Sequence, residues 1–286
     1  MVKTLILANS RGIVMRKLLY EVQEPKTLEE MTWEEAGTHL KETEICTVST
    51  GAIEQHGYHL PLNCDTLIVQ EMAKRAAEKL ESEGIQILVG PTIHFGVNPE
   101  AMNYPGSVTL RPETHKNLIK DICISLHHHG IKKIVFLMGH DGNWPVMTMA
   151  AQELITETDL EIICVNWLLA IEKHERELLS LQKADGHGGA GETSRALASF
   201  PNLVHLERAR GYFPPFSKSK KVPYSMPPLL GGGVYNPKST RSKFTPFEYP
   251  GQVGDPKLAT KEAGEQVYAL LAEWLADVIN QQFLGK

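Results

Sequence analysis

The chain has 286 residues, of which 42% are apolar, with a net charge of -5 and a pI near 6.2. This length and apolar content suit one large α/β domain, and the lack of a basic patch excludes nucleic acid as an expected partner. Apolar runs are too short for a secretory signal or a membrane span, so we expect a cytoplasmic protein without a membrane partner. The four cysteines form no CxxC pair, which is typical of reduced thiols.

Strand-like and helix-like runs alternate from about residue 30 to residue 200. Thr32 stands three residues before Glu35, a capping-box pattern that begins the first helix. Such repeated units with apolar strands predict a three-layer α/β/α fold with a mainly parallel sheet. The expected strands are 44–50, 85–96, 132–140 and 160–167, and the expected helices are 32–43, 65–84, 111–130, 143–158 and 257–283.

Two segments fall outside this alternation. We expect one domain over residues 1–286, with residues 1–27 as an N-terminal extension and residues 209–256 as an insertion. The insertion is rich in Pro, Gly and aromatic residues without a regular period. It is either a surface loop or a lid or oligomer contact, since many aromatic side chains in water would be unusual. Nothing in the pattern explains the part before Met15.

Polar side chains follow successive strands. Glu54 and His56 come after the first strand, Asp65 begins the next helix, and His140 follows the third strand. The stretch "DGHGGAGETS" (185–194) comes after the last strand. Because the carboxyl ends of parallel strands form one crevice, we expect these residues to meet in a single site.

The residue types in this site suit divalent metal ions. Imidazoles and carboxylates bind Zn²⁺ or Mn²⁺, and one carboxylate can bridge two ions. Glu54 and His56 can approach neighbouring ions, with Asp65 between them. Taken alone, Asp65 would be a helix cap and Glu192 an acid favoured by the helix dipole, but their joint placement favours metal.

Other polar residues have open interpretations. Cys64 is a packing thiol or, if a base lies beside it, a nucleophile. His59 and Asp141 either support the ligands or are structural, and His94 lines the pocket or packs beneath it. The histidines at 127–129 are expected at a solvated helix end.

With these residues in place, the sequence resembles the creatininase (creatinine amidohydrolase) family. The resemblance rests on "GAIEQHGYHLPLNCDT", "HFGVNPEAMNYPGSVTL", "MGHDGN" and "DGHGGAGETS", which occur in order. It covers about residues 28–205, with a weaker match near the C-terminus. It implies an α/β/α fold, a hydrolytic site with two Zn²⁺ or Mn²⁺ ions, a small-molecule substrate, and assembly into homo-oligomers, often hexamers.

The resemblance also implies roles for individual residues. Glu192 becomes a further carboxylate ligand or catalytic orienting group, and His187 the group that moves a proton to or from the leaving group. Substrate contacts are implied for Trp167 and expected for His94 and Asp141. Four metal ligands are implied, with the aspartate as the bridge: Glu54, His56, Asp65 and His140.

One position departs from the family pattern. Creatininase proper has a metal-binding glutamate two residues after the histidine matched by His140, where this chain has Gly142. The second ion would then need another ligand, such as Glu192. We expect a two-metal hydrolase in which metal-bound hydroxide cleaves an amide-type C–N bond of a small, polar, cyclic substrate. The alternatives are a C–C hydrolase that opens an inositol-derived diketo-cyclitol ring, and a non-catalytic metal-binding or assembly protein.

Overall fold

The computed structural model describes residues 5–9, 12–16, 22–181, 185–213 and 250–285. Its main sheet consists of β3 (Ile45–Thr50), β4 (Thr92–Ile93), β5 (Lys133–Met138) and β6 (Glu161–Val165). These four strands are parallel and lie in the order β4-β3-β5-β6. Thr50 at the end of β3 is opposite Met138 at the end of β5. The segments that follow the two inner strands therefore start side by side.

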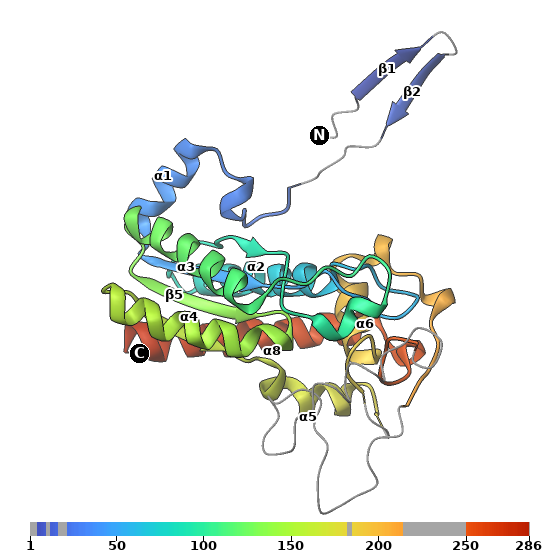
Figure 1. The fold of residues 1–286 in the computed structure, drawn as a ribbon. Coiled ribbons are helices and arrows are strands. Elements are labelled where there is room, and N and C mark those ends of the chain that lie inside the picture. The colour runs from blue at the N-terminus through green and yellow to red at the C-terminus, as the bar shows by residue number, and fades with distance from the viewer. Residues whose placement is uncertain (1–4, 10–11, 17–21, 182–184, 214–249, 286) are drawn as a thin grey trace, which may run out of the picture.

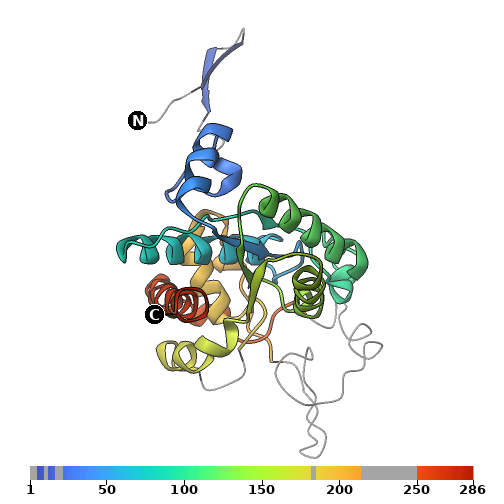
Figure 2. The same ribbon diagram turned by 90° about the vertical axis from the view of Figure 1, so that its left-hand side faces the viewer.

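Helices cover both faces of this sheet (Figure 1 and Figure 2). One face packs against α2 (Cys64–Ser82) and α8 (Lys261–Ile279), with α5 (Leu168–Leu178) and α6 (Ala190–Ser199) alongside α8. The other face packs against α3 (Pro112–His128) and α4 (Trp144–Glu157). In β5, Val135 and Leu137 join the first core, whereas Phe136 and Met138 join the second. The predicted three-layer α/β/α fold is confirmed.

The predicted strand 85–96 is mostly wrong. Only β4 forms within it, together with isolated bridges at Leu88, Val89 and Gly96. Pro91 has no N–H to donate, and Gly90 lies so close to β3 that a side-chain carbon there would be 2.1 Å from the Thr47 carbonyl oxygen. Helix α5 was not anticipated. The other predicted strands and helices form close to their expected bounds, and His128 and His129 are exposed at the end of α3.

The N-terminal region forms a separate hairpin. Strands β1 (Leu5–Asn9) and β2 (Gly12–Arg16) pair with each other in antiparallel register and are not part of the main sheet. Helix α1 (Trp33–Glu42) begins with the expected capping box between Thr32 and Glu35. Short helical turns occur at η1 (Leu28–Glu30), η2 (Pro99–Asn103), η3 (Asp141–Asn143), η4 (Pro201–Leu203), η5 (Leu206–Arg208), η7 (Pro256–Leu258) and η8 (Asn280–Leu284).

The two ends of the insertion meet. Residues 214–249, most of the segment set apart in the sequence, lie outside the described part of the chain. At its base, Tyr212 and Gly254 exchange two backbone hydrogen bonds of 2.8 Å. Val253, which precedes Gly254, donates its N–H to the His187 carbonyl oxygen at 2.7 Å. The returning strand of the insertion therefore helps to hold the loop that carries His187.

None of the helices that the structure describes is long and apolar enough to cross a membrane.

Candidate metal centre

The polar motifs converge at the carboxyl edge of the sheet. The loop after β3 carries Glu54 and His56, Asp65 lies in the first turn of α2, and His140 follows β5. Glu192 lies in the first turn of α6. The structure therefore brings together residues from four parts of the chain that the sequence assigned to one site.

Asn143 fastens the loops around this edge. Its side-chain amide donates to the Gly51 carbonyl oxygen at 2.9 Å, and its side-chain oxygen accepts from the Val97 N–H at 2.9 Å. Asn143 is fully buried. This one side chain ties the loop after β3 to the loop after β4, which makes the placement of Glu54 and His56 rigid.

The first group of candidate ligands comprises Glu54, Asp65 and His140. Glu54 Oε1 and Asp65 Oδ2 each lie 3.4 Å from His140 Nδ1. Atoms that share one ion, each about 2.0 to 2.2 Å from it, are about 3.0 to 3.6 Å apart. All three residues are buried. Their spacing fits one metal ion.

The second group comprises His56, Asp65 and Glu192. His56 Nε2 lies 2.9 Å from Asp65 Oδ1 and 3.7 Å from Glu192 Oε1. The other oxygen of Glu192 accepts a hydrogen bond of 2.5 Å from the Gly188 N–H. That bond leaves Glu192 Oε1 directed at His56. His56 thus has one carboxylate on each side, Asp65 and Glu192.

Asp65 belongs to both groups. Its Oδ1 faces His56 and its Oδ2 faces His140. Oδ2 is buried and has no hydrogen-bond partner, a state that costs about 1 to 3 kcal/mol or more for a charged group. A cation would satisfy this atom. The donor set, three carboxylates and two imidazoles, is the type that Zn²⁺ and Mn²⁺ prefer.

Both candidate histidine ligands are oriented by backbone carbonyls. His56 Nδ1 is 3.1 Å from the Glu54 carbonyl oxygen, and His140 Nε2 is 3.3 Å from the Val97 carbonyl oxygen. A carbonyl oxygen only accepts, so each of these nitrogens carries the proton. The opposite nitrogen of each ring is left to face the carboxylates. Such a partner on the outer nitrogen is the usual arrangement of a metal-binding histidine.

The carboxylates of the cluster create a negative potential that favours positive charge. Burial opposes charging of His56 and His140, but the neighbouring carboxylates outweigh it and raise both pKa values well above the ordinary one. Burial would raise the pKa of Glu192, yet the charges of His56 and His187 lower it to about 2. The carboxylates thus hold protons on the imidazoles. Divalent ions would take the place of those protons.

Comparison with known proteins identifies the family. The sequence model described as creatinine amidohydrolase matches residues 29–279. The chain belongs to the creatininase family. Members of this family are metal-dependent amidohydrolases, so the chain is a metal-dependent hydrolase of the creatininase type.

Three relatives of this creatininase-family chain have different named activities. Creatinine amidohydrolase of Pseudomonas putida is 26% identical over 271 residues, which cover 89% of this chain and 96% of that protein. A mycofactocin precursor peptide peptidase of Mycobacterium tuberculosis is 27% identical, covering 79% and 80%. A 3-dehydro-scyllo-inosose hydrolase of Thermotoga maritima is 26% identical, covering 87% and 81%.

Solved creatininases share the fold of this chain. A creatinine amidohydrolase crystal structure superposes with a TM-score of 0.71 at 26% identity, covering 91% of this chain and 99% of the other. A mutant creatininase of the Zn-Zn type and a creatininase with Mn each superpose with a TM-score of 0.70 at 27% identity, covering 90% and 99%. The creatininase fold therefore extends over nearly the whole chain.

The departure at Gly142 has a structural basis. A side-chain carbon there would lie 2.3 Å from the Val97 carbonyl oxygen and 2.6 Å from His140 Nε2. A glutamate cannot be accommodated without moving the loop that orients His140. Glu192 faces His56 instead, and its role as the replacement ligand stays a prediction.

His187 lies beside the ligands but differs from them in exposure. Its Nε2 is 2.6 Å from the Gln55 carbonyl oxygen, so this nitrogen carries the proton. Its Nδ1 is 3.5 Å from Glu54 Oε1, and its ring is 4.2 Å from that of His56. The side chain is 27% exposed. Nδ1 therefore faces the cluster from a position that a substrate can reach.

The three residues expected to contact substrate are not grouped. Asp141, in η3, is half-buried, and burial raises its pKa to about 6. His94 is exposed. Trp167 is 3% exposed, with its ring nitrogen donating to the Met138 carbonyl oxygen at 2.5 Å. Substrate contact by these residues stays a prediction.

The sequence reading missed two residues near the site. The backbone of Gln55 fixes the protonation of His187, and its side-chain oxygen accepts from the Gly57 N–H at 3.1 Å. Glu100, in η2, places Oε1 3.9 Å from His140 Nε2. Both lie inside motifs that carried the family resemblance. Membership of a matched motif was the available signal.

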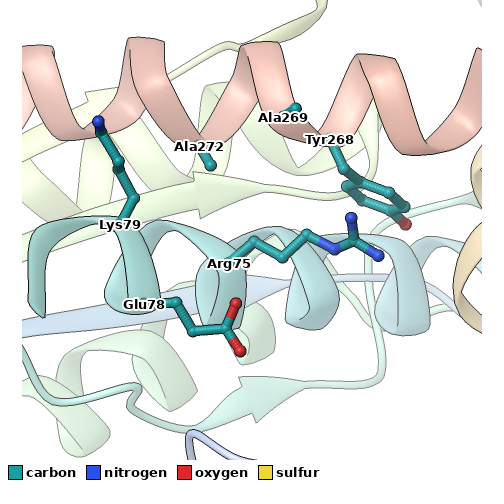
Figure 3. A pocket seen from close by; sticks show the side chains of 6 residues that line it. All are labelled: Arg75, Glu78, Lys79, Tyr268, Ala269 and Ala272. Carbon is teal, nitrogen blue, oxygen red and sulfur yellow. The ribbon is translucent and has the colours of Figure 1, made fainter. Parts of the chain in front are cut away.

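A second charged region does not qualify as a site. A shallow groove of about 350 Å³ runs between α2 and α8 (Figure 3). Arg75 pairs with Glu71 and Glu265 at 2.7 Å each, and Lys79 pairs with Glu273 at 3.0 Å. Both cations of the groove thus have carboxylate partners, which leaves little charge for a ligand. Its lining residues are Arg75, Glu78, Lys79, Tyr268, Ala269 and Ala272.

Proposed function

We propose that this chain is a two-metal hydrolase that cleaves an amide-type C–N bond in a small, polar, cyclic substrate. The observation that carries the proposal is the position of Asp65. Its two oxygens face different ligand groups, His56 on one side and His140 on the other. A single carboxylate placed in this way is suited to bridge two ions.

The ligands divide between the two positions. Glu54, Asp65 and His140 would hold one ion. His56, with Asp65 on one side and Glu192 on the other, would hold the second. When bound, such ions lower the pKa of water and polarise a carbonyl group. Zn²⁺ and Mn²⁺ are the proposed metals, supported by the donor types and by creatininases solved with each.

His187 is the proposed proton-transfer group. Its Nδ1 faces the cluster, and the Gln55 carbonyl oxygen accepts from Nε2 on the other side of the ring. In the hydrolysis, Nδ1 would take a proton and pass it to the nitrogen that leaves the cleaved amide. Such a group contributes about 10² to 10⁴ in rate. Glu192 supports the same step by holding the loop, since it accepts from the Gly188 N–H.

The second candidate is a C–C hydrolase that opens the ring of an inositol-derived diketo-cyclitol. The match to the Thermotoga maritima 3-dehydro-scyllo-inosose hydrolase favours it. The replacement of the creatininase glutamate by Gly142 also favours a substrate other than creatinine. The two candidates share the metal centre and differ in the bond that breaks.

Metal analysis tests the proposal. Protein purified without added metal, and again after chelation and refilling, would be analysed for divalent metal per chain. We expect close to two ions, restored by Zn²⁺ or Mn²⁺. The loaded enzyme would then be assayed with creatinine, other cyclic amides and diketo-cyclitols. No ion after refilling would refute the hydrolase and favour the non-catalytic metal-binding or assembly protein.

The remaining expectations are part of the same proposal. We propose a single domain over residues 1–286, with the extension 1–27 and the insertion 209–256 as additions to it. We also propose a cytoplasmic homo-oligomer, with a hexamer as the assembly that family resemblance suggests. The backbone hydrogen bonds between Tyr212 and Gly254, at the two ends of the insertion, support its description as a loop that leaves one domain and returns to it.

A further inference from the structure

His59 attaches the loop after β3 to the region of α6 by two hydrogen bonds. Its ring Nε2 is hydrogen-bonded to the hydroxyl oxygen of Thr193, in α6, at 2.9 Å. Its carbonyl oxygen accepts the N–H of His205, in the segment that follows α6, at 2.8 Å. His59 and Thr193 are both fully buried. The side chain and the backbone of one residue therefore hold the loop against the same part of the fold.

The loop leaves room for the ring of His59 in this position. Gly57, two residues earlier, has a φ of 71°, a conformation that favours glycine. A side-chain carbon at Gly57 would lie 3.0 Å from His59 Nδ1 and 3.2 Å from His59 Cε1. A larger residue at Gly57 would therefore displace either the ring or the loop. The glycine keeps open the space in which the ring reaches Thr193.

The hydrogen bond between His59 and Thr193 lies beside two candidate metal ligands. Thr193 directly follows Glu192 in the first turn of α6. His59 follows His56 by three residues in the loop after β3. His56 Nε2 and Glu192 Oε1, one from each element, are 3.7 Å apart. The hydrogen bond therefore connects the two elements whose relative position sets the distance between these ligands.

Two other roles fit His59 less well. Within the described part of the chain, it belongs to none of the groups of side chains whose ligand atoms lie close enough together to hold an ion. It also has no exposed surface, so a substrate cannot reach it. Packing alone does not require its hydrogen bond to Thr193, because an apolar ring of similar size would fill the same space.

We propose that His59 is a positioning residue that holds His56 and Glu192 at the spacing needed for the second ion. This inference rests on the proposed two-metal function. Asn143 has a similar place on the other side of the centre, where it fastens the loops after β3 and β4. The hydrogen bond between His59 and Thr193 should therefore affect the affinity for the second ion and leave the first ion in place.

Titration of matched variants with Zn²⁺ alone tests this role. Thr193→Val removes the hydroxyl and nearly keeps the size of the side chain, whereas Thr193→Ser keeps the hydroxyl. The unmutated chain and Thr193→Ser should bind two ions. In Thr193→Val, the affinity for the second ion should fall by about 10- to 100-fold, with the first ion unaffected.

Thr66→Val is the matched control. Thr66 is also fully buried and directly follows a candidate ligand, Asp65, but its hydroxyl has no hydrogen-bond partner. Loss of that hydroxyl should leave the affinity for both ions unchanged. A second-ion affinity that falls equally in Thr66→Val and Thr193→Val would overturn the positioning role, because the hydrogen bond to His59 would then not be the cause.

Variants of His59 keep the test decisive if Thr193→Val does not fold. The side-chain amide of His59→Gln reaches the position of Nε2, whereas that of His59→Asn reaches only the position of Nδ1. His59→Gln should therefore keep the second ion, and His59→Asn should lose affinity for it. Two ions bound with unchanged affinity in His59→Asn would overturn the positioning role and leave the hydrolase proposal intact. Failure of the unmutated chain to bind any ion would overturn both proposals.

Discussion

Helix α2 carries ionisable side chains at two places, with opposite outcomes. In its first turn, Asp65 is buried among imidazoles and other carboxylates, and one of its oxygens has no hydrogen-bond partner. Three turns later, Arg75 and Lys79 lie in the groove against α8, each paired with carboxylates (Figure 3). The helix is the same, but the charges are opposite in sign. The places also differ in burial, and at the first one a carboxylate oxygen lacks a hydrogen-bond partner.

This difference distinguishes a candidate metal site from a surface with ordinary ion pairs. Paired and partly exposed ions are screened by water and contribute about 0 to 1 kcal/mol each. A buried carboxylate oxygen without a hydrogen-bond partner costs free energy in the apo protein, and a bound cation removes that cost. Variants at the two places should therefore have different effects. A change at Asp65 should alter metal content, whereas a change at Arg75 should lower stability slightly.

The largest effect is expected for Asp65→Asn. A neutral amide bridges two cations poorly, so both ions should be lost or displaced. Loss of several kcal/mol of stabilisation by the ions lowers the rate about 10³-fold or more. Metal per chain and turnover would be measured together. The control is Glu78→Gln, an exposed carboxylate on the same helix. Full occupancy with full activity in Asp65→Asn would exclude a bridging role.

The next effect is expected for His187→Ala. This change should leave metal content unaltered, because His187 is not among the proposed ligands. Turnover should fall by about 10²-fold or more with the loss of the proton-transfer group. Elemental analysis and kinetics on one preparation separate the two effects. Unchanged turnover would move the proton-transfer role to another group, and loss of an ion would make His187 a ligand.

A stability effect is expected from His115, in α3. Its side chain is fully buried, and burial lowers its pKa from 6.5 to about 4. As pH falls, His115 therefore becomes protonated near pH 6.5 in the unfolded chain but only near pH 4 in the folded chain. Stability is present above pH 6.5 and lost as pH falls, by about 3 kcal/mol at pH 4.

His115→Gln should remove most of that pH dependence. Urea unfolding of metal-free protein at pH 7 and pH 4 would measure it, so that ion release does not contribute. His128→Gln is the matched control, since His128 is exposed at the end of the same helix. A loss of stability that is the same in the unmutated chain and in His115→Gln would show that His115 is charged in the folded protein.

The smallest effect is expected in the groove. Arg75→Met removes two ion pairs and a cation–π contact with Tyr268 at 4.5 Å. Partial exposure limits the cost to about 1 kcal/mol. Thermal or urea unfolding would measure it, and metal content should not change. A change in metal content would mean that the groove and the metal centre at the start of α2 are coupled.

Much of the fold was predictable because it depends on local pattern. The helical spacing of apolar residues in α2 and the capping box at Thr32 act within a few residues, and both formed as expected. The strand at 85–96 failed because its packing against β3 and the missing N–H of Pro91 override its apolar composition. Local propensity is a weak guide where a neighbouring strand decides the backbone.

The sequence by itself determined which residues gather at the sheet edge. Polar motifs that follow parallel strands must meet there, so Glu54, Asp65 and His140 could be named together. Only the tertiary structure decided which oxygen of Asp65 faces which histidine, and that Glu192 stands opposite His56. The reason is physical: sequence spacing sets the order of side chains, whereas their directions depend on loop backbones and on carbonyl groups supplied by distant segments.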